Sequence, residues 1–384
     1  MEVFKQAGFK VTKGDAWSVL WGRPAELLTE DVLRALGPFQ RINHFPGTWE
    51  LGRKDSLYRN VAAARRLKGA AFDFIPKYFL LPGDAGAFQS ELEHYPGKYD
   101  FEDLWARSAR QPRGSCHPPE RFTSDTGRCH SRRVAYILKP VASSRGRGVR
   151  VVADPRSLDL TALEECLLQR YITDPFLIDG YKFDLRVYVA VTSLDPLRVY
   201  VHEEGLVRFA TQRYSSSSAS YRQRRRHLTN YAVNKGHAGG ATADGGAAAQ
   251  HGISGDGEGE LDATVGSGGG QGGDEGRGGA RHCPKWSLAM LRRHLEARGH
   301  DWGHVWEQVK DIAAKTLIAA EPRMGACTRA AVRHRNCCFE LFGLDVMLDS
   351  SLRAWLLEVN TTPSLAVDSP LDERVKGSVV ADLM

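Results

Sequence analysis

The chain has 384 residues, a formal net charge of +6, and hydrophobic and charged fractions of 42% and 26%. This length suffices for two or three packed subdomains, and the composition is that of an ordinary soluble protein rather than a disordered one. No apolar run approaches a membrane span, and the N-terminus lacks a signal-peptide pattern. The seven cysteines are scattered without a C-x-x-C pair. This usage disfavours a disulfide framework or a zinc site and indicates a reducing cytosol.

The positive charge is clustered, most densely at residues 222–226, which read RQRRR. A basic balance favours an acidic partner, such as nucleic acid, anionic lipid or an acidic protein tail. A solvated basic surface explains the same charge, so charge alone leaves these interpretations open.

The first 82 residues predict a small N-terminal α/β subdomain. Thr29 is a capping residue at the start of a helical pattern, and Leu57, Val61 and Ala64 share one face of another. We therefore expect a strand at 16–21, helices at 29–36 and 54–66, and a strand bounded by prolines at 72–82.

Two segments change in composition and are expected to lie outside the packed fold. Pro, Arg, Ser and Gly dominate residues 95–133 without periodicity, and we assign a low-order insertion to residues 83–133. Residues 236–280 are dominated by Gly and cannot bury enough surface to offset the entropy of ordering. We interpret them as a disordered Gly-rich insertion.

A strand, a loop of small residues and a second strand are predicted between residues 134 and 152. Gly146 and Gly148 would let the loop backbone approach a ligand, while Lys139 and Arg145 supply positive charge. This order is typical of a flap whose backbone N–H groups cradle phosphate. A plain β-hairpin turn is the alternative. With a helix at 161–166 and a strand at 167–172, residues 134–180 form the predicted central subdomain.

The segment at 181–191 alternates between polar and apolar residues. On a strand, Lys182, Asp184 and Arg186 share one face, which suggests an electrostatic site for phosphates and a metal. An amphipathic edge strand explains the same alternation. Residues 198–210 then predict a hairpin that carries Arg208 on a strand.

Two strand-like runs, at 342–348 and 355–360, flank a polar turn. Paired antiparallel, they would bring Asp345, Glu358 and Asn360 onto one face. A carboxylate in a buried strand is costly unless something pairs with it, and hard oxygen ligands suit Mg²⁺. Two carboxylates at a solvated sheet edge are the alternative. Helices are expected at 285–297, 305–320 and 375–384.

Five motifs follow one another along the chain: KPVASSRGRG at 139–148, QRYI at 169–172, KFDLR at 182–186, HLTNY at 227–231 and LEVN at 357–360. Each motif is weak alone. In this order and spacing, the chain resembles the tubulin tyrosine ligase-like family. The details SSRGRG, EEG at 203–205 and PSLA at 363–366 resemble its polyglutamylase subgroup, which includes members four and five, the latter most of all.

The resemblance implies an α+β architecture, the ATP-grasp fold, with ATP and Mg²⁺ between two α+β subdomains. The second subdomain would comprise residues 181–235 and 281–384. The implied activity is ATP- and Mg²⁺-dependent polyglutamylation, which forms isopeptide bonds between glutamate and glutamate side chains of tubulin tails through an acylphosphate. One alternative is a related ligase that adds glycine or tyrosine, or that modifies a non-tubulin acidic protein. Another is a non-catalytic microtubule- or nucleic-acid-binding module.

The implied partners are the acidic C-terminal tails of tubulin or microtubules, and L-glutamate. Nucleic acid and membranes are not expected as partners, and we expect a monomer. The resemblance implies a cytoplasmic, cytoskeletal location, with the cilium or basal body as a further site.

The resemblance also implies roles for individual residues. Those expected to contact ATP at its phosphates or adenine are Lys139, Arg145, Gly146, Gly148, Gln169, Arg170, Tyr171, Ile172, Lys182, Asp184, Thr229 and Asn230. The incoming amino acid would bind Arg208, with Tyr231, Lys235 and Thr361 as further candidates. The catalytic candidates are Arg186, Arg208 and Glu358, and the expected Mg²⁺ ligands are Asp345, Glu358 and Asn360.

Overall fold

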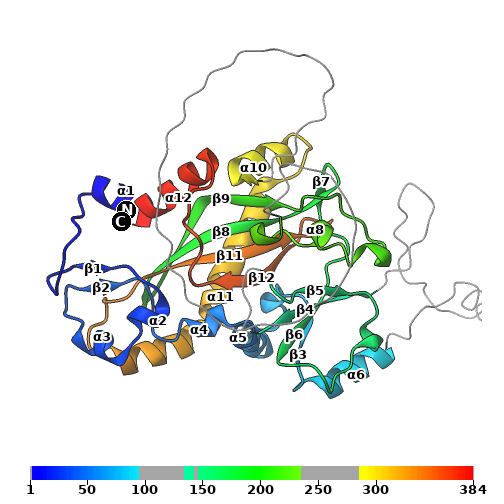
Figure 1. The fold of residues 1–384 in the computed structure, drawn as a ribbon, viewed down its shortest axis with the longest axis horizontal. Helices are drawn as coiled ribbons and strands as arrows, with labels where there is room; N and C mark the ends of the chain where they lie inside the picture. The colour runs from blue at the N-terminus through cyan, green and yellow to red at the C-terminus, as the bar shows by residue number, and fades with distance from the viewer. Residues whose placement is uncertain (1, 95–133, 142–145, 235–284, 384) are drawn as a thin grey trace, which may run out of the picture. The chain divides into compact units, whose positions relative to one another are not determined.

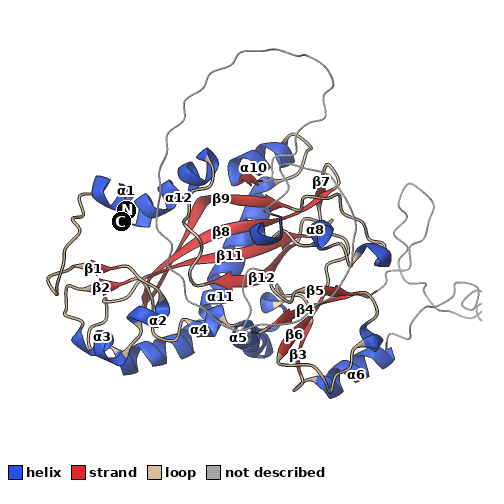
Figure 2. Ribbon diagram, viewed as in Figure 1, coloured by secondary structure: helices blue, strands red, loops and turns tan. Residues whose placement is uncertain are grey.

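The computed structural model describes residues 2–94, 134–141, 146–234 and 285–383 (Figure 1). The predicted insertions therefore lie outside the described residues, apart from the start of the first, and so do Arg145 and Lys235. Within the described ranges, no helix has the length and apolar character to cross a membrane. The architecture is mixed α/β, with helices on antiparallel sheets (Figure 2).

The larger sheet has the strand order β10-β9-β8-β11-β12, with β7 paired to β8. Its strands are β7 (Leu177–Ile178), β8 (Tyr181–Leu194), β9 (Leu197–Phe209), β10 (Lys285–Ser287), β11 (Glu340–Leu348) and β12 (Ala354–Asn360). All of its pairs are antiparallel. The hairpin predicted within residues 198–210 is wrong, because β9 is one strand that pairs with β8 along its length.

The two faces of this sheet are covered by different helices. Phe183, Leu185 and Val187 pack in one core with α10 (Leu288–Glu296) and α11 (Trp302–Ala331). Tyr188 lies on the other face, with Val375 of α12 (Pro370–Leu383). The predicted alternation of β8 is thus confirmed, and the three C-terminal helices form close to where the sequence predicts them.

The smaller sheet has the order β3-β6-β4-β5 and is also antiparallel. Its strands are β3 (Tyr78–Leu81), β4 (Tyr136–Pro140), β5 (Arg150–Val152) and β6 (Cys166–Arg170). Helix α6 (Ala85–His94) packs on it through Phe88.

Three expectations for this region are wrong. Residues 85–94 form α6 rather than part of a low-order insertion. Strand β3 joins the smaller sheet, so the boundary predicted at residue 82 separates β3 from α6, which packs on the same sheet. Residues 161–165 form turns and bends rather than a helix. Asp159 accepts hydrogen bonds from the Thr161 N–H and hydroxyl, local bonds that compete with a helix.

The N-terminal part carries short elements around a two-stranded parallel sheet. Helix α3 starts where Thr29 accepts a hydrogen bond from the Val32 N–H, as predicted. The strand predicted at 16–21 shrinks to two half-buried residues. The elements are α1 (Glu2–Gln6), β1 (Val19–Leu20), α2 (Pro24–Leu27), α3 (Glu30–Ala35), β2 (Arg41–Ile42), α4 (Trp49–Gly52) and α5 (Lys54–Lys68).

A buried carboxylate attaches this part to the larger sheet. Glu340, at the start of β11, is fully buried. It accepts hydrogen bonds from His44 Nδ1 at 2.7 Å, the Phe45 N–H at 3.0 Å and the Thr48 hydroxyl at 2.6 Å. Such a carboxylate is tolerated because three donors satisfy it.

Two short helices and three 3-10 helices complete the described part of the chain. The helices are α8 (Arg224–His227) and α9 (Tyr231–Asn234), and the 3-10 helices are η1 (Gly69–Phe72), η2 (Pro155–Ser157) and η3 (Ser218–Ser220).

Candidate active site

A cavity lies between the two sheets and collects most of the predicted site residues. It contains about 1310 Å³ of space not occupied by atoms, open solvent included. Predicted residues that line it are Lys139, Gly146, Gln169, Arg170, Tyr171, Ile172, Lys182, Asp184, Thr229, Asn230, Asp345, Glu358, Asn360 and Thr361.

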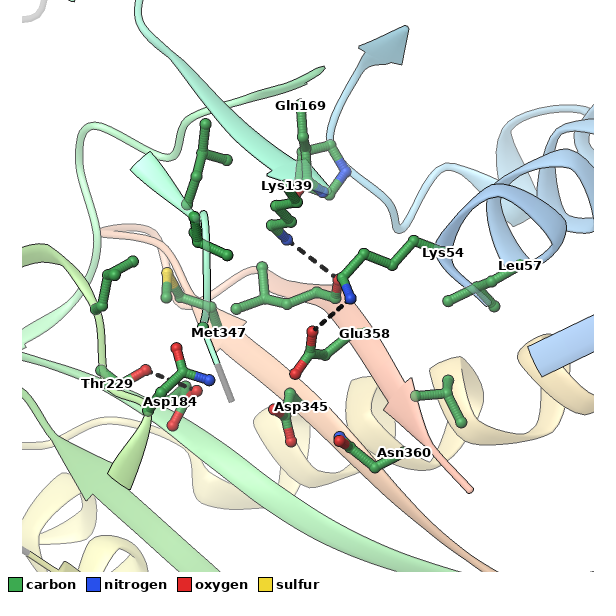
Figure 3. Close-up of a pocket in the computed structure, with 18 of the residues that line it drawn as sticks. Lys54, Leu57, Lys139, Gln169, Asp184, Thr229, Asp345, Met347, Glu358 and Asn360 are labelled. Carbon is green, nitrogen blue, oxygen red and sulfur yellow. Dashed lines mark hydrogen bonds and ion pairs between the residues drawn. The ribbon is translucent and has the colours of Figure 1, made fainter. Parts of the chain in front are cut away.

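The predicted carboxylate pair forms as expected from the pairing of β11 with β12. Asp345 stands opposite Glu358, and Gly343 stands opposite Asn360. The Asn360 amide nitrogen donates to the Gly343 carbonyl at 3.2 Å, which orients this side chain. Figure 3 shows Asp345, Glu358 and Asn360 side by side below Lys139. Three oxygen-bearing side chains therefore share one wall of the cavity.

The two carboxylates have opposite electrostatic environments. Burial alone would raise the pKa of Asp345, but Arg186 and Arg208 outweigh burial and hold that pKa below its usual range. Arg186 Nε lies 2.7 Å from one Asp345 oxygen, and an Arg208 terminal nitrogen lies 2.8 Å from the other. Burial and the nearby Asp345 charge raise the pKa of Glu358, against the pull of Lys54 and Lys139. Lys54 Nζ stands 3.8 Å from Glu358.

This donor set fits a divalent cation that shares its shell with phosphate. A cation beside Glu358 would relieve the repulsion from Asp345 that raises the Glu358 pKa. No cluster of three or more His, Cys, Asp or Glu side chains that could hold a metal occurs among the described residues. The protein thus offers two carboxylates and an amide oxygen, a partial shell of the kind Mg²⁺ completes with water and phosphate.

Two buried lysines face the same cavity from opposite sheets. Lys139 lies on β4, and its Nζ donates to the Leu357 carbonyl at 3.4 Å. Lys182 lies on β8, and its Nζ donates to the Tyr171 hydroxyl at 2.9 Å. Burial lowers the pKa of Lys139 to about 8 and that of Lys182 to about 7. An anion in the cavity would stabilise both charged forms.

The predicted phosphate loop has the backbone that glycine permits. Gly146 has φ +73° and Gly148 has φ +70°, a region that other residues rarely adopt. A Cβ at Gly148 would lie 2.7 Å from Pro140 Cγ. Gly146 lines the cavity, whereas Gly148 is not among the lining residues.

Two predicted arginines stand behind the cavity wall. Arg186 and Arg208 are not among the lining residues, but both contact Asp345, and Arg208 also forms a two-point ion pair with Asp184. Thr229 donates to Asp184 at 2.8 Å and completes this network. The Arg208 guanidinium is thus engaged by two carboxylates of the protein itself.

Lys54, His227 and Met347 are among the residues that line the cavity and that sequence reasoning missed. Lys54 begins α5, and in the sequence it looks like a surface lysine. Met347 looks like an ordinary core residue. His227 stands inside the HLTNY motif, which is the one signal that could have found it. Of the remaining predicted residues, Arg145 and Lys235 lie outside the described residues, and the Tyr231 side chain is not described.

Comparison with known proteins identifies the family of the chain. The model of the tubulin-tyrosine ligase family matches residues 33–252 and 277–384. The chain belongs to the tubulin-tyrosine ligase family. The resemblance stated from the motifs is therefore confirmed.

Relatives in the tubulin-tyrosine ligase family include two human proteins. The chain is 37% identical to human tubulin polyglutamylase TTLL5 over 92% of its length and 22% of the relative's. It is 35% identical to human tubulin monoglutamylase TTLL4 over 98% of its length and 25% of the relative's. Tubulin polyglutamylase ttll-5 of Caenorhabditis elegans is 31% identical over 97% of this chain and 43% of the relative. The chain thus spans about a quarter of the length of these two human relatives.

Proposed function

We propose that this protein is an ATP- and Mg²⁺-dependent ligase that joins glutamate to glutamate side chains of tubulin tails through an acylphosphate. The printed names of the relatives support the choice of glutamate and tubulin. The observation that carries the proposal is the meeting of Lys139 and Lys182 with Asp345 and Glu358 in one cavity between two sheets. This set matches the charges of a metal–polyphosphate ligand.

The chemistry follows from the charges. A carboxylate is a poor electrophile at neutral pH, and ATP with Mg²⁺ would supply the phosphoryl group that turns it into an acylphosphate. Lys139 and Lys182 would neutralise phosphate charge. Asp345, Glu358 and Asn360 would hold the metal, and Arg186 would hold Asp345 in its charged form. Catalysis then depends on positioning and charge neutralisation, without a covalent protein nucleophile.

We assign the nucleotide to the space between the two sheets, as in an ATP-grasp fold. Gln169 to Ile172 would meet the adenine, and Gly146 with Lys139 would hold phosphates. Arg208 remains a candidate for the amino-acid carboxylate. Because Arg208 is already paired with Asp184 and Asp345, it would have to give up part of an ion pair to bind the amino-acid carboxylate.

The basic segment offers a surface for an acidic tail at the rim of this cavity. Arg222 and Arg224 are exposed, and Arg224 donates to the carbonyl of the cavity residue Gly146 at 2.6 Å. Within the described part of the chain, Arg222, Arg224 and Arg225 have no carboxylate partner. Unpaired cations attract a polyanionic chain and steer it toward the site. With tubulin tails as its substrate, the protein would act at the cytoskeleton.

The test is a ligation assay with the purified chain, ATP, MgCl₂, microtubules and isotope-labelled glutamate, glycine or tyrosine in separate reactions. Mass spectrometry of the tubulin tails reads the product. Glutamate on internal tail glutamates is the expected result. Transfer of glycine or tyrosine alone would mean that the added amino acid is not glutamate. The absence of Mg²⁺-ATP binding would overturn the proposal.

A further inference from the structure

His227 is a cavity residue to which the proposed chemistry gives no role. It ends α8, is 2% exposed, and sits among the rings of Tyr171, Tyr214 and Tyr221. Its two ring nitrogens both have partners, and these partners lie in different directions from the ring. Nδ1 lies 2.9 Å from the Tyr171 hydroxyl, while Nε2 lies 3.1 Å from the Ser220 carbonyl.

The direction of each hydrogen bond follows from which atoms can donate. In its charged form Lys182 only donates, so its ammonium donates a hydrogen bond to the Tyr171 oxygen, 2.9 Å away. His227 Nε2 also lies 3.1 Å from Ser220 Oγ, but that hydroxyl directs its proton at the carbonyls of Ser215 and Ser217. Since the Ser220 carbonyl only accepts, Nε2 carries the proton of the ring. In the neutral ring Nδ1 is then an acceptor for the Tyr171 hydroxyl. The Tyr214 oxygen is the competing acceptor, because Tyr214 gives its own proton to the Thr173 carbonyl and also hydrogen-bonds Tyr171. Burial and the charge of Lys182 lower the pKa of His227 to about 4, which keeps the ring neutral near pH 7.

The four groups therefore form one directed series from Lys182 through Tyr171 and His227 to the Ser220 carbonyl. Tyr171 also places its ring under the ammonium, with the centroid 4.3 Å from Lys182 Nζ. A tyrosine hydroxyl can rotate its single proton. When the hydroxyl points its proton at Nδ1, a lone pair of the Tyr171 oxygen stays directed at Lys182. Hydrogen bonds in series also strengthen one another.

We infer that His227 is a positioning residue: by accepting the Tyr171 proton it directs the tyrosine oxygen at Lys182 and so fixes the ammonium where the polyphosphate binds. The inference rests on the nucleotide site proposed above. A purely structural role, in which the ring only fills space among three tyrosines, is the competing explanation. The two explanations differ in which substitutions are tolerated.

Matched variants separate these explanations. His227→Asn places an amide oxygen near the position of Nδ1 and keeps an acceptor for Tyr171. His227→Gln places its amide nearer to Nε2 and keeps only the Ser220 contact, and His227→Phe fills the space without either bond. We expect His227→Phe and His227→Gln to weaken Mg²⁺-ATP binding about tenfold, the effect of losing a hydrogen bond to a charged group, and His227→Asn to lose much less. Thermal unfolding checks that each variant is folded.

A double-mutant cycle gives the decisive measurement. Tyr171→Phe removes the hydroxyl but keeps the ring under Lys182. If His227 acts through that hydroxyl, His227→Phe has little further effect on ATP affinity in the Tyr171→Phe background. Additive losses, or a His227→Asn variant as weak as His227→Phe, would overturn the inference.

A second readout does not depend on nucleotide binding. Competitive acetylation of the unliganded protein, read by mass spectrometry, reports how much of Lys182 is the reactive free amine. Losing the acceptor disfavours the ammonium form, so Lys182 should react faster in His227→Phe and Tyr171→Phe at pH 7. Unchanged reactivity in both variants would overturn the inference. If instead reactivity changes but the wild-type chain binds no Mg²⁺-ATP, the proposed function fails while the role of His227 toward Lys182 stands.

Discussion

At the scale of single residues, the site gives different charge environments to two carboxylates that stand opposite each other on β11 and β12. Asp345 is held charged by two arginines, whereas Glu358 has only Lys54, at 3.8 Å, and Lys139 to offset its burial and the charge of Asp345. Asp345 is thus part of an ion-pair network in the free protein. Of these two carboxylates, Glu358 has the less compensated charge and gains more from a cation.

Replacing Glu358 should abolish ligation without harming the fold. Because its pKa is raised in the folded state, the ionised Glu358 disfavours folding at neutral pH, and Glu358→Gln removes that burden. We expect ligation to fall at least about 100-fold, with a melting temperature equal to or above that of the wild type. Glu93→Gln, an exposed position on α6, is the matched control. Retained ligation in Glu358→Gln would contradict the metal assignment.

The two buried lysines predict a proton uptake on nucleotide binding. A polyphosphate raises both lysine pKa values from about 8 and about 7, so the complex holds more protons than the free protein. ATP affinity should therefore fall as the pH rises through 7 and 8, by up to about tenfold per pH unit for each proton. Calorimetry of ATP binding in buffers of different ionisation enthalpy measures the proton uptake, and Lys182→Met should remove the part of the uptake that Lys182 contributes. A binding enthalpy that is the same in every buffer would contradict this prediction.

At the scale of elements, Gly146 and Gly148 between β4 and β5 both have a positive φ, which other residues adopt only with strain. Gly148 combines a positive φ with contact to Pro140, so two independent constraints act on one backbone position. This loop also carries Gly146 into the cavity wall. Its conformation therefore links local backbone chemistry directly to the proposed phosphate contacts.

Gly148→Ala should loosen this loop and weaken Mg²⁺-ATP binding by about tenfold or more, because a Cβ at 2.7 Å from Pro140 forces the backbone to move. Gly86→Ala is the control, since Gly86 lies in α6 with open space where its Cβ would stand. There alanine favours the helix and should leave ATP affinity unchanged. Equal ATP affinity in Gly148→Ala and the wild type would contradict this role of the loop.

The strands that carry the site were predictable because side chains alternate along a strand. This alternation placed Lys182 with Asp184, and Glu358 with Asn360, before any tertiary contact was known. The continuous strand β9 was not predictable in the same way, since Glu203, Glu204 and Gly205 read as a turn. Gly205 is instead required inside the strand, where a Cβ would lie 2.5 Å from the Arg186 carbonyl.

At the scale of the whole molecule, the residues that sequence reasoning missed are those placed by packing between distant segments. Lys54 reaches Glu358 across 304 positions of the chain, a contact that no local pattern encodes. The ion pairs of Arg208 with Asp184 and Asp345 likewise arise only when three strands assemble. Local periodicity predicts which face a residue occupies, and the assembly of sheets decides its partners.

The basic rim should control encounter with an acidic chain rather than chemistry. Arg222→Gln combined with Arg225→Gln should weaken binding of a polyglutamate peptide several-fold at low salt, and the difference should shrink as salt screens the charges. Arg198→Gln combined with Arg335→Gln is the control, with the same change in net charge at exposed positions. Titration by fluorescence anisotropy at several salt concentrations measures the effect. Equal losses in both double variants would mean that net charge, not this rim, is responsible.

Strand β11 carries a carboxylate on each of its faces, five positions apart: Glu340 satisfied by the N-terminal segment, and Asp345 by the arginines of the cavity. A slip of the strand by one residue would turn both to the wrong side. Each carboxylate would then face apolar neighbours without donors. The N-terminal segment thus favours one register of β11, the register in which its donors meet Glu340.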